Sequence, residues 1–292
     1  MSATPPAGPV LLSYFTLRDL PALLTAAHAT GLTDGAIVHV GSYGANPRAA
    51  KAVHEAECRY APMVALRNVA PGARRLAAMT STQRVAAGRE AGRAFRDEMR
   101  SPLFRAEAWQ FDELSRDVAR SRPLREFVRG MLDGLLHGRA ADPALRGFVW
   151  LSGEASGLPR LPIDSELQRF WQVVGAASLR LVGEEFPAFV GSPAAAARVE
   201  DAGRRALAAG GPVRRRLASA YAAGITPGYR LAPGLGGNVD KRSRAFVNRW
   251  RNGYLAARRS AGVTDFAVFN FRFANASPQV MHDVLAALTR VV

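Results

Sequence analysis

An alternation of short apolar runs with longer amphipathic segments constrains this chain more than any other feature of its sequence. Each apolar run has the length of a strand, and in the segment behind it apolar residues recur every three or four positions, as on one face of a helix. This order predicts a parallel sheet covered by helices, because neighbouring parallel strands need a crossover connection. The eight predicted strands are residues 10–15, 36–40, 61–66, 106–111, 147–151, 186–191, 228–232 and 266–273.

The number of these units and the chain length together favour a closed barrel. Eight strand-then-helix units in 292 residues match a single (β/α)8-barrel domain, which typically takes roughly 250 residues. An open parallel α/β sheet is the alternative, but such a sheet with a dinucleotide site carries glycines after its first strand, where this chain reads FTLRDL. We therefore predict one TIM-like barrel domain over residues 1–292, with residues 1–9 as a flexible N-terminal arm.

Two of the predicted helices carry additional signals. Thr80 or Ser81 is positioned to cap a long helix, and the apolar stripe of that helix includes Gly88 and Gly92. Glycines on a buried stripe indicate that two backbones approach closely. A second clear apolar stripe predicts a helix over residues 164–181.

The charge of the chain comes almost entirely from arginine. The sequence has 39 Lys+Arg against 24 Asp+Glu, a net charge of +15, yet only Lys51 and Lys241 are lysines. Such a bias is typical of a GC-rich bacterium, and the scarcity of lysine argues against Schiff-base chemistry. The arginines are spread over several predicted helices without interleaved aromatic residues, so we do not expect nucleic acid as a partner.

Cysteine, histidine and hydropathy exclude several other classes. The single Cys58 cannot form an internal disulfide or a Cys-rich metal site, and a buried, unreactive thiol is the expected state. The five histidines show no HxH or HExxH spacing, so we expect no metal and no cofactor. No apolar stretch approaches the roughly 18 residues of a membrane span. We expect a cytoplasmic protein, or a secreted one if a leader peptide has been removed, and leave its oligomeric state open.

Acidic residues stand at two of the predicted strand ends, where barrels hold their chemistry. The motif WQFDEL places Asp112 and Glu113 after the fourth strand, and SGEAS places Glu154 after the fifth. Paired carboxylates can cleave a glycosidic bond, one protonating the leaving oxygen and the other acting as nucleophile or base. We interpret Glu113 as the acid and Glu154 or Asp112 as its counterpart. A helix cap or ion pair for Asp112, a helix-dipole role for Glu113 and an exposed turn for Glu154 remain alternatives.

Other strand-end residues could contact a sugar. Aromatic side chains stack on the apolar faces of sugar rings, and Tyr43 and Tyr229 are the best placed of them. Asn270 and Arg272 are polar positions in an otherwise apolar last strand and would orient the substrate. The remaining predicted substrate-binding residues are Tyr14, His39, Gln110 and Arg230, although His39 could equally be a hydrogen-bonded residue of the barrel wall.

The eightfold alternation, with WQFDEL at the fourth strand and SGEAS after the fifth, resembles the broad class of (β/α)8 glycoside hydrolases. The resemblance implies a barrel enzyme that acts on a carbohydrate, with an acid at the end of the fourth strand. The chain carries neither the DxxDxDxE signature of family 18 chitinases nor an Asn–Glu pair at the fourth strand. The resemblance is therefore to the class and to no specific family.

Two alternative functions remain open at this stage. The glycine-rich PGLGGN runs into a predicted helix, and such a loop can bind phosphate through backbone N–H groups, as in a phosphosugar enzyme. Its spacing is not that of a P-loop. The second alternative is a non-catalytic barrel that binds a glycan or another polyanion. The candidate phosphate-binding residues are Gly236, Gly237, Asn238 and Lys241.

Overall fold

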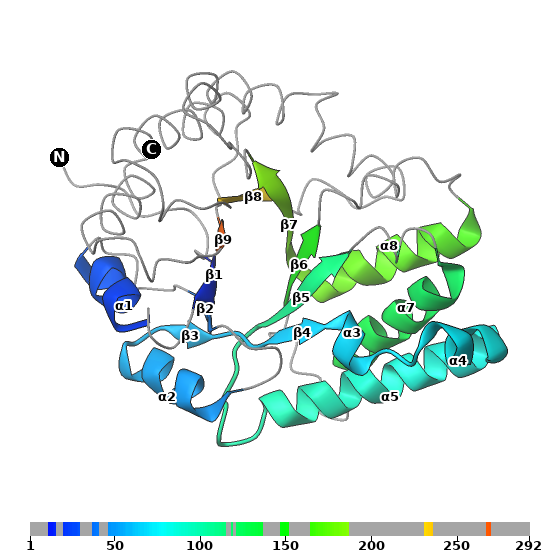
Figure 1. Ribbon diagram of the computed structural model, residues 1–292, viewed down its shortest axis with the longest axis horizontal. Coiled ribbons are helices and arrows are strands. Elements are labelled where there is room, and N and C mark those ends of the chain that lie inside the picture. Colours follow the sequence, from blue (N-terminus) through cyan, green and yellow to red (C-terminus); the bar gives the residue numbers. More distant parts are fainter. Residues whose placement is uncertain are drawn as a thin grey trace.

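A parallel sheet forms the centre of the structure, with helices outside it (Figure 1). The computed structural model describes residues 11–15, 20–29, 37–40, 46–114, 118, 121–136, 147–151, 164–186, 231–235 and 267–269. The strands in these residues are β1 (Leu11–Phe15), β2 (Ile37–Val40), β3 (Arg59–Tyr60), β4 (Met63–Ala65), β5 (Trp109–Leu114), β6 (Gly147–Leu151), β7 (Ser178–Phe186), β8 (Leu231–Leu235) and β9 (Ala267–Phe269).

The strands pair in the order β3-β2-β1-β9-β8-β7-β6-β5-β4, and every pair is parallel. The two ends of this order are neighbours in the chain, because only Ala61 and Pro62 separate β3 from β4. The N–H of Ala61 donates to the carbonyl oxygen of Val38 at 2.9 Å, and the N–H of Gln110 donates to that of Pro62 at 2.9 Å. One extended segment therefore pairs with β2 and with β5, and the predicted α/β class is confirmed.

Several of the helices begin at a capping side chain, although α3 and α4 begin without one. The Asn46 side chain accepts hydrogen bonds from the N–H groups of Arg48 and Ala49, both at 3.1 Å. Thr80 and Gln83 form a reciprocal capping box, which confirms the predicted start at Thr80. The helices are α1 (Leu20–Ala29), α2 (Pro47–Glu55), α3 (Leu66–Val69), α4 (Ala73–Ala78), α5 (Ser81–Met99), α7 (Arg122–Leu136) and α8 (Ser165–Ala177).

Large apolar side chains fill the layer between sheet and helices. Phe170 and Trp171 of α8 pack edge to face, with ring centroids 5.4 Å apart, an arrangement that aromatic pairs prefer. Burying each such ring contributes roughly 1.5–3 kcal/mol relative to leaving it exposed. The largest fully buried side chains of the described residues are Tyr60, Trp109, Phe111, Phe127, Phe148, Phe170 and Trp171.

Four glycines let α5 and α7 pack backbone against backbone. A Cβ atom added at Gly88 would overlap the carbonyl oxygen of Phe127, and one added at Gly92 would overlap that of Met131. From the other helix, Gly130 and Gly134 meet the backbone of α5 in the same way. The predicted close packing at Gly88 and Gly92 is therefore present, and its partner is a second pair of glycines with the same spacing.

Three predicted boundaries were wrong. The strand expected at 106–111 is β5, so Asp112 and Glu113 lie within a strand and not after it. The strand expected at 228–232 extends to Leu235. The helix expected over 164–181 ends at Ala177, and β7 (Ser178–Phe186) follows it; of the strand expected at 186–191, all but Phe186 lies outside the described residues. Here the helical spacing of apolar residues overlaps an alternating Leu-Arg-Leu pattern, and pairing with β6 selects the strand.

Two buried titratable side chains, Cys58 just before β3 and Tyr60 within it, predict that the protein loses stability at alkaline pH. Burial, reinforced by the charge of Glu57, raises the pKa of Cys58 from 9.0 to about 11. Burial also raises the pKa of Tyr60 from 10.0 to about 12, a hydrogen bond from Asn46 partly opposing it and the charge of Glu98 adding to it. Both folded-state values lie above the unfolded ones, so this stability is complete below pH 9 and is lost as the pH rises through about 11.

Urea unfolding between pH 7 and pH 11 measures this loss. The Cys58→Ala variant should lose less stability than the wild type between pH 9 and pH 11, because the thiol no longer has to ionise on unfolding. Identical pH dependence in the two proteins would contradict the assignment.

Candidate functional site

The carboxyl ends of the strands lie at one edge of the sheet, because all of its pairs are parallel. Near this edge, three strands advance by three residues while a neighbouring strand advances by two, which is the signature of a β-bulge. The aligned residues on either side are Leu12↔Val38 and Phe15↔Val40 for β1 and β2, Phe111↔Val149 and Leu114↔Leu151 for β5 and β6, and Gly183↔Pro233 and Phe186↔Leu235 for β7 and β8.

In each of these three strands, two residues lie between the aligned positions, and we call each such pair a step. The residues of all three steps are polar or acidic. Bulges are over-represented beside active sites, where they redirect side chains. Asp112 and Glu113 fall in the step of β5, as a predicted catalytic pair. The other steps hold Ser13 and Tyr14 of β1, and Glu184 and Glu185 of β7.

The acidic pair of β7 was missed from the sequence. Glu184 and Glu185 lie beyond the predicted helix over 164–181 and before the predicted strand over 186–191. They do not follow a predicted strand, so they were not among the candidate site residues. The available signal was the alternation of apolar and polar residues from Ser178 onward. In the sheet order, one strand separates β7 from β5. At roughly 4.8 Å per strand spacing, the backbones of the two acidic steps are about 10 Å apart.

The structure places three other predicted site residues in strands. Tyr14 lies in β1 and His39 in the neighbouring β2, both toward the carboxyl edge. Gln110 is fully buried, and its amide nitrogen donates to the carbonyl oxygen of Ala61 at 3.4 Å, a contact within the sheet. Its role toward a substrate stays a prediction. The predicted residues that lie outside the described part of the chain are Tyr43, Glu154, Tyr229, Arg230, Gly236, Gly237, Asn238, Lys241, Asn270 and Arg272.

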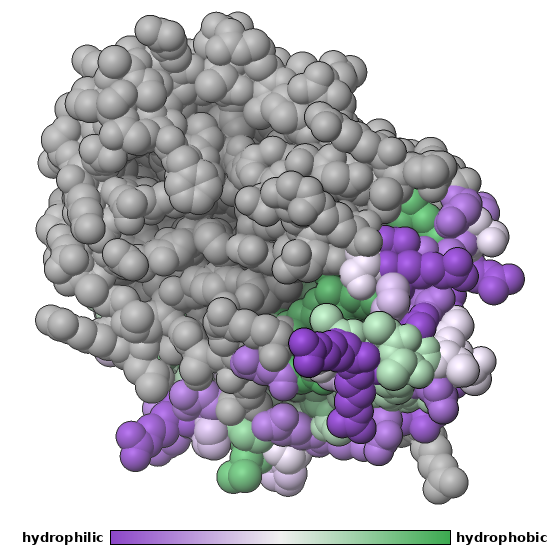
Figure 2. Space-filling model, turned by 45° about the vertical axis from the view of Figure 1, so that its right-hand side comes forward, coloured by the Kyte–Doolittle hydropathy of each residue, from purple (hydrophilic) through white to green (hydrophobic). Residues whose placement is uncertain are grey.

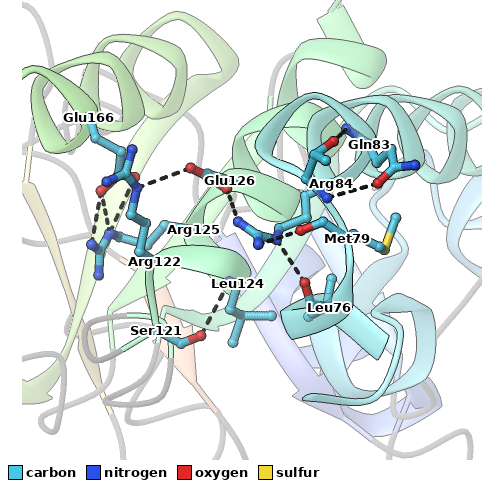
Figure 3. A network of polar contacts seen from close by, with 11 residues as sticks. Leu76, Met79, Gln83, Arg84, Ser121, Arg122, Leu124, Arg125, Glu126 and Glu166 are labelled. Carbon is cyan, nitrogen blue, oxygen red and sulfur yellow. Dashed lines mark hydrogen bonds and ion pairs between the residues drawn. The ribbon is translucent and has the colours of Figure 1, made fainter. Parts of the chain in front are cut away.

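Arginine side chains link the first turns of α5, α7 and α8 to two buried glutamates (Figure 3). Arg84 of α5 donates to the Glu126 carboxylate of α7 at 2.5 Å, and Arg122 donates to the other oxygen of Glu126 at 3.1 Å. Arg125 of α7 donates to Glu166 of α8 at 2.8 Å and 3.1 Å. The side chains of Glu126 and Glu166 are 2% and 8% exposed, so both are paired in the interior of the protein.

Arg84 and Arg125 also donate to backbone carbonyl oxygens that precede their helices in the chain. Arg84 donates to the carbonyl oxygens of Leu76 and Met79, at 2.7 Å and 2.5 Å. Arg125 donates to the carbonyl oxygen of Val118 at 3.3 Å, and Val118 is fully buried. Each arginine therefore fixes a strand-to-helix connection at the edge where the strands end.

Glu126 is held in its charged form. Burial raises the pKa of its carboxyl, but hydrogen bonds from Arg84, Ser81 and Arg122, together with the charge of Arg84, outweigh this and bring the pKa below the usual 4.5. An ionised carboxylate between two guanidinium groups acts as a structural counter-ion and not as a proton donor. The network thus orders the helices and leaves acid–base chemistry to other carboxyl groups.

The described residues offer no site for a metal and no membrane-spanning helix. They contain no group of three or more His, Cys, Asp or Glu side chains arranged to bind a metal ion. None of their helices is long and apolar enough to cross a bilayer. Figure 2 shows mainly hydrophilic side chains on the described part of one face. Among the described residues, the large apolar side chain that stands out as exposed is Leu103, at 69%.

Comparison with known proteins identifies the fold and no specific family. No protein-family model and no curated protein matches the chain. A solved GH18 chitinase from Pseudoalteromonas aurantia superposes with a TM-score of 0.54 at 9% identity, covering 98% of this chain and 100% of that one. A sugar phosphate isomerase/epimerase from Parabacteroides distasonis gives a TM-score of 0.48 at 12% identity, over 99% and 96%. The chain therefore broadly resembles (β/α)8-barrel glycoside hydrolases in fold.

Proposed function

We propose that this chain is a carbohydrate-active hydrolase built on a single (β/α)8 barrel over residues 1–292. The pairing of β3 with β2 and of β4 with β5 supports closure, since these two short strands belong to one extended segment. Counting that segment once gives eight strands, the number in a TIM barrel. The similarity in fold to a chitinase is in keeping with a sugar substrate but does not identify one.

The observation that carries the proposal is the pair of acidic steps at the carboxyl edge, on β5 and β7. Glycosidases place two carboxyl groups about 5–5.5 Å apart for retention, or about 6.5–9.5 Å apart for inversion. Acidic side chains rising from backbones about 10 Å apart can converge to such separations. Glu113 is the proposed general acid, and Glu154 or Asp112 is the proposed nucleophile or base. Glu184 and Glu185 join them as candidates for that second role.

Two of the residues proposed to bind substrate lie toward the same edge. Tyr14 and His39 lie in adjacent strands there, where a ring and an imidazole could contact one sugar unit. The others follow the strands in sequence, Tyr43 and Tyr229 for stacking and Asn270 and Arg272 for orientation. Gln110 and Arg230 complete the proposed set. Together these residues would give the site aromatic and polar side chains, which can stack on a sugar ring and fix its orientation.

Amide variants of the five acids test the proposal on a panel of polysaccharides. Glu113→Gln should reduce turnover on the order of 10²- to 10⁴-fold, the usual contribution of a general acid, at a nearly unchanged melting temperature. One of Asp112→Asn, Glu154→Gln, Glu184→Gln and Glu185→Gln should show a comparable loss and so identify the partner. Glu90→Gln, an exposed position on α5, serves as the matched control.

Undiminished turnover in Glu113→Gln and in all four partner variants would overturn the paired-carboxylate mechanism. If the wild type retains glycans without cleaving any of them, the binding-module alternative replaces the hydrolase. When turnover is present, the anomeric configuration of the first product, followed by NMR, reports whether the carboxyl pair is close or widely separated.

A further inference from the structure

Arg125 makes two kinds of contact, and one of them is with the chain a few residues beyond the proposed acids. Its side chain is 9% exposed, and its guanidinium group pairs with Glu166 of α8 and also donates to the carbonyl oxygen of Val118. Val118 lies in the chain between the end of β5 at Leu114 and the start of α7 at Arg122. Asp112 and Glu113 stand in β5 just before that connection. Arg125 thus contacts the chain a few residues beyond the proposed general acid.

Glu166 extends the same contact to the next strand-and-helix unit. It lies in the first turn of α8, whose start is capped by Asp164 through a 2.8 Å hydrogen bond from the N–H of Leu167. Residues 152–164 connect β6 to this helix and include Glu154. The Arg125–Glu166 pair therefore joins the helix starts behind the two strands that lead to Glu113 and Glu154.

The arrangement occurs twice in succession, which argues against a chance contact. Arg84, at the start of α5, binds the Leu76 and Met79 carbonyls of its own preceding connection and the carboxylate of Glu126 on the next helix. Arg125 repeats this pattern one unit later, with the Val118 carbonyl and Glu166. In both cases the guanidinium group fixes a connection at the carboxyl edge relative to the following helix.

Stability alone does not account for such a pair. The free energy needed to remove two charges from water is about as large as the free energy gained from their attraction. A protein with an apolar pair of similar volume in their place is often equally stable. An apolar pair lacks the directed hydrogen bond from Arg125 to the Val118 carbonyl. What the ion pair provides beyond packing is therefore a defined position for the Val118 backbone.

We propose that Arg125, oriented by Glu166, is a positioning residue that sets the placement of the β5 carboxylates through the connection 115–121. The catalytic part of this inference rests on the proposed function. The contact of Arg125 with Val118 does not depend on the proposed function. Two separate measurements are therefore needed, one of amide exchange in the chain after β5 and one of turnover.

The test replaces both charges at once in the full-length protein. The double variant Arg125→Met/Glu166→Met removes the hydrogen bond to Val118 without leaving an unpaired buried charge. Amide hydrogen exchange over residues 112–121 should accelerate about tenfold or more, while exchange over residues 59–65 and the melting temperature stay close to wild type. On a cleaved polysaccharide, kcat should fall about tenfold with KM little changed, and the pH optimum should shift.

A matched double variant of the same helix layer serves as the control. Arg89→Met/Asp133→Met removes the 2.6 Å pair between α5 and α7, a pair that is partly exposed. It should leave exchange over 112–121 and kcat unchanged. Should the first double variant fail to fold, Arg125→Lys keeps a charge for Glu166 but loses the planar fork, and the same exchange increase is expected.

Each result supports or overturns the inference. Faster exchange confined to 112–121, with lower kcat, supports it. Faster exchange there in a protein whose wild type cleaves no glycan supports the positioning of the connection and contradicts the hydrolase proposal alone. Unchanged exchange over 112–121, or an equal increase in every segment, overturns the positioning role even if activity falls.

Discussion

Replacing Gly92 with alanine is expected to lower the free energy of unfolding by about 3 kcal/mol or more. An added methyl group there would lie against the carbonyl group of Met131, with the carbonyl carbon at 2.9 Å. The obstacle is helix backbone and not a flexible side chain, so α5 and α7 can accept the methyl only by moving apart. Such a movement also separates the facing glycines Gly130 and Gly134 from the backbone of α5.

The sign of this effect makes the prediction specific. Alanine is a better helix former than glycine by roughly 1 kcal/mol, so a helix without the close contact would be stabilised by the same change. Gly72→Ala is the matched control, because a methyl group at Gly72 meets nothing within 4 Å, and its effect should stay within about 0.5 kcal/mol. Urea unfolding of the three proteins decides the matter, and a Gly92→Ala protein as stable as the wild type would show that the helices do not pack in this way.

This helix pair shows which parts of the fold the sequence can predict. The capping box at Thr80 and Gln83 is local, and residues within one turn specify it. Gly88 and Gly92 can be picked out from the sequence because they lie on an apolar stripe. Their partners in α7, Gly130 and Gly134, cannot be picked out in this way, because the contact depends on how the two helices align.

The sheet boundaries show the opposite situation, in which local signals compete. Around Ser178 a helical spacing of apolar residues and an alternating pattern share the same stretch of chain. Parallel pairing of Phe148 with Arg180 and of Val149 with Leu181 selects the strand, and this pairing connects distant residues. The acidic step of β7 was missed for that reason, whereas Asp112 and Glu113 follow an unambiguous apolar run.

The buried ion pairs could not be predicted from local sequence at all. Arg125 and Glu126 are consecutive charged residues, which on a helix usually face solvent, yet both are buried. Their partners come from other helices, Glu166 for the first and Arg84 for the second. Only the tertiary arrangement of α5, α7 and α8 shows that these charges are compensated, and their burial makes them sensitive to substitution.

Replacing Glu126 with glutamine is accordingly expected to lower the free energy of unfolding by about 3 kcal/mol at neutral pH, since breaking one side of a buried pair leaves an uncompensated charge. Arg84, 14% exposed, would keep its carbonyl contacts and lose its counter-ion. The pKa of Glu126 lies below its unfolded value of 4.5, so its stabilisation is complete above that value and is lost as the pH falls through the folded-state pKa.

The difference in stability between wild type and Glu126→Gln should therefore be largest near neutral pH and shrink as the pH falls below 4.5, because the wild-type carboxyl then takes up a proton and also loses its charge. Urea unfolding at a series of pH values measures this difference, with the exposed Glu90→Gln of α5 as the control, for which little change is expected at any pH. A difference that stays constant into acid would mean that the glutamine disturbs packing and not charge. In that case the pairing of Arg84 with Glu126 contributes no electrostatic stabilisation to the contact between α5 and α7.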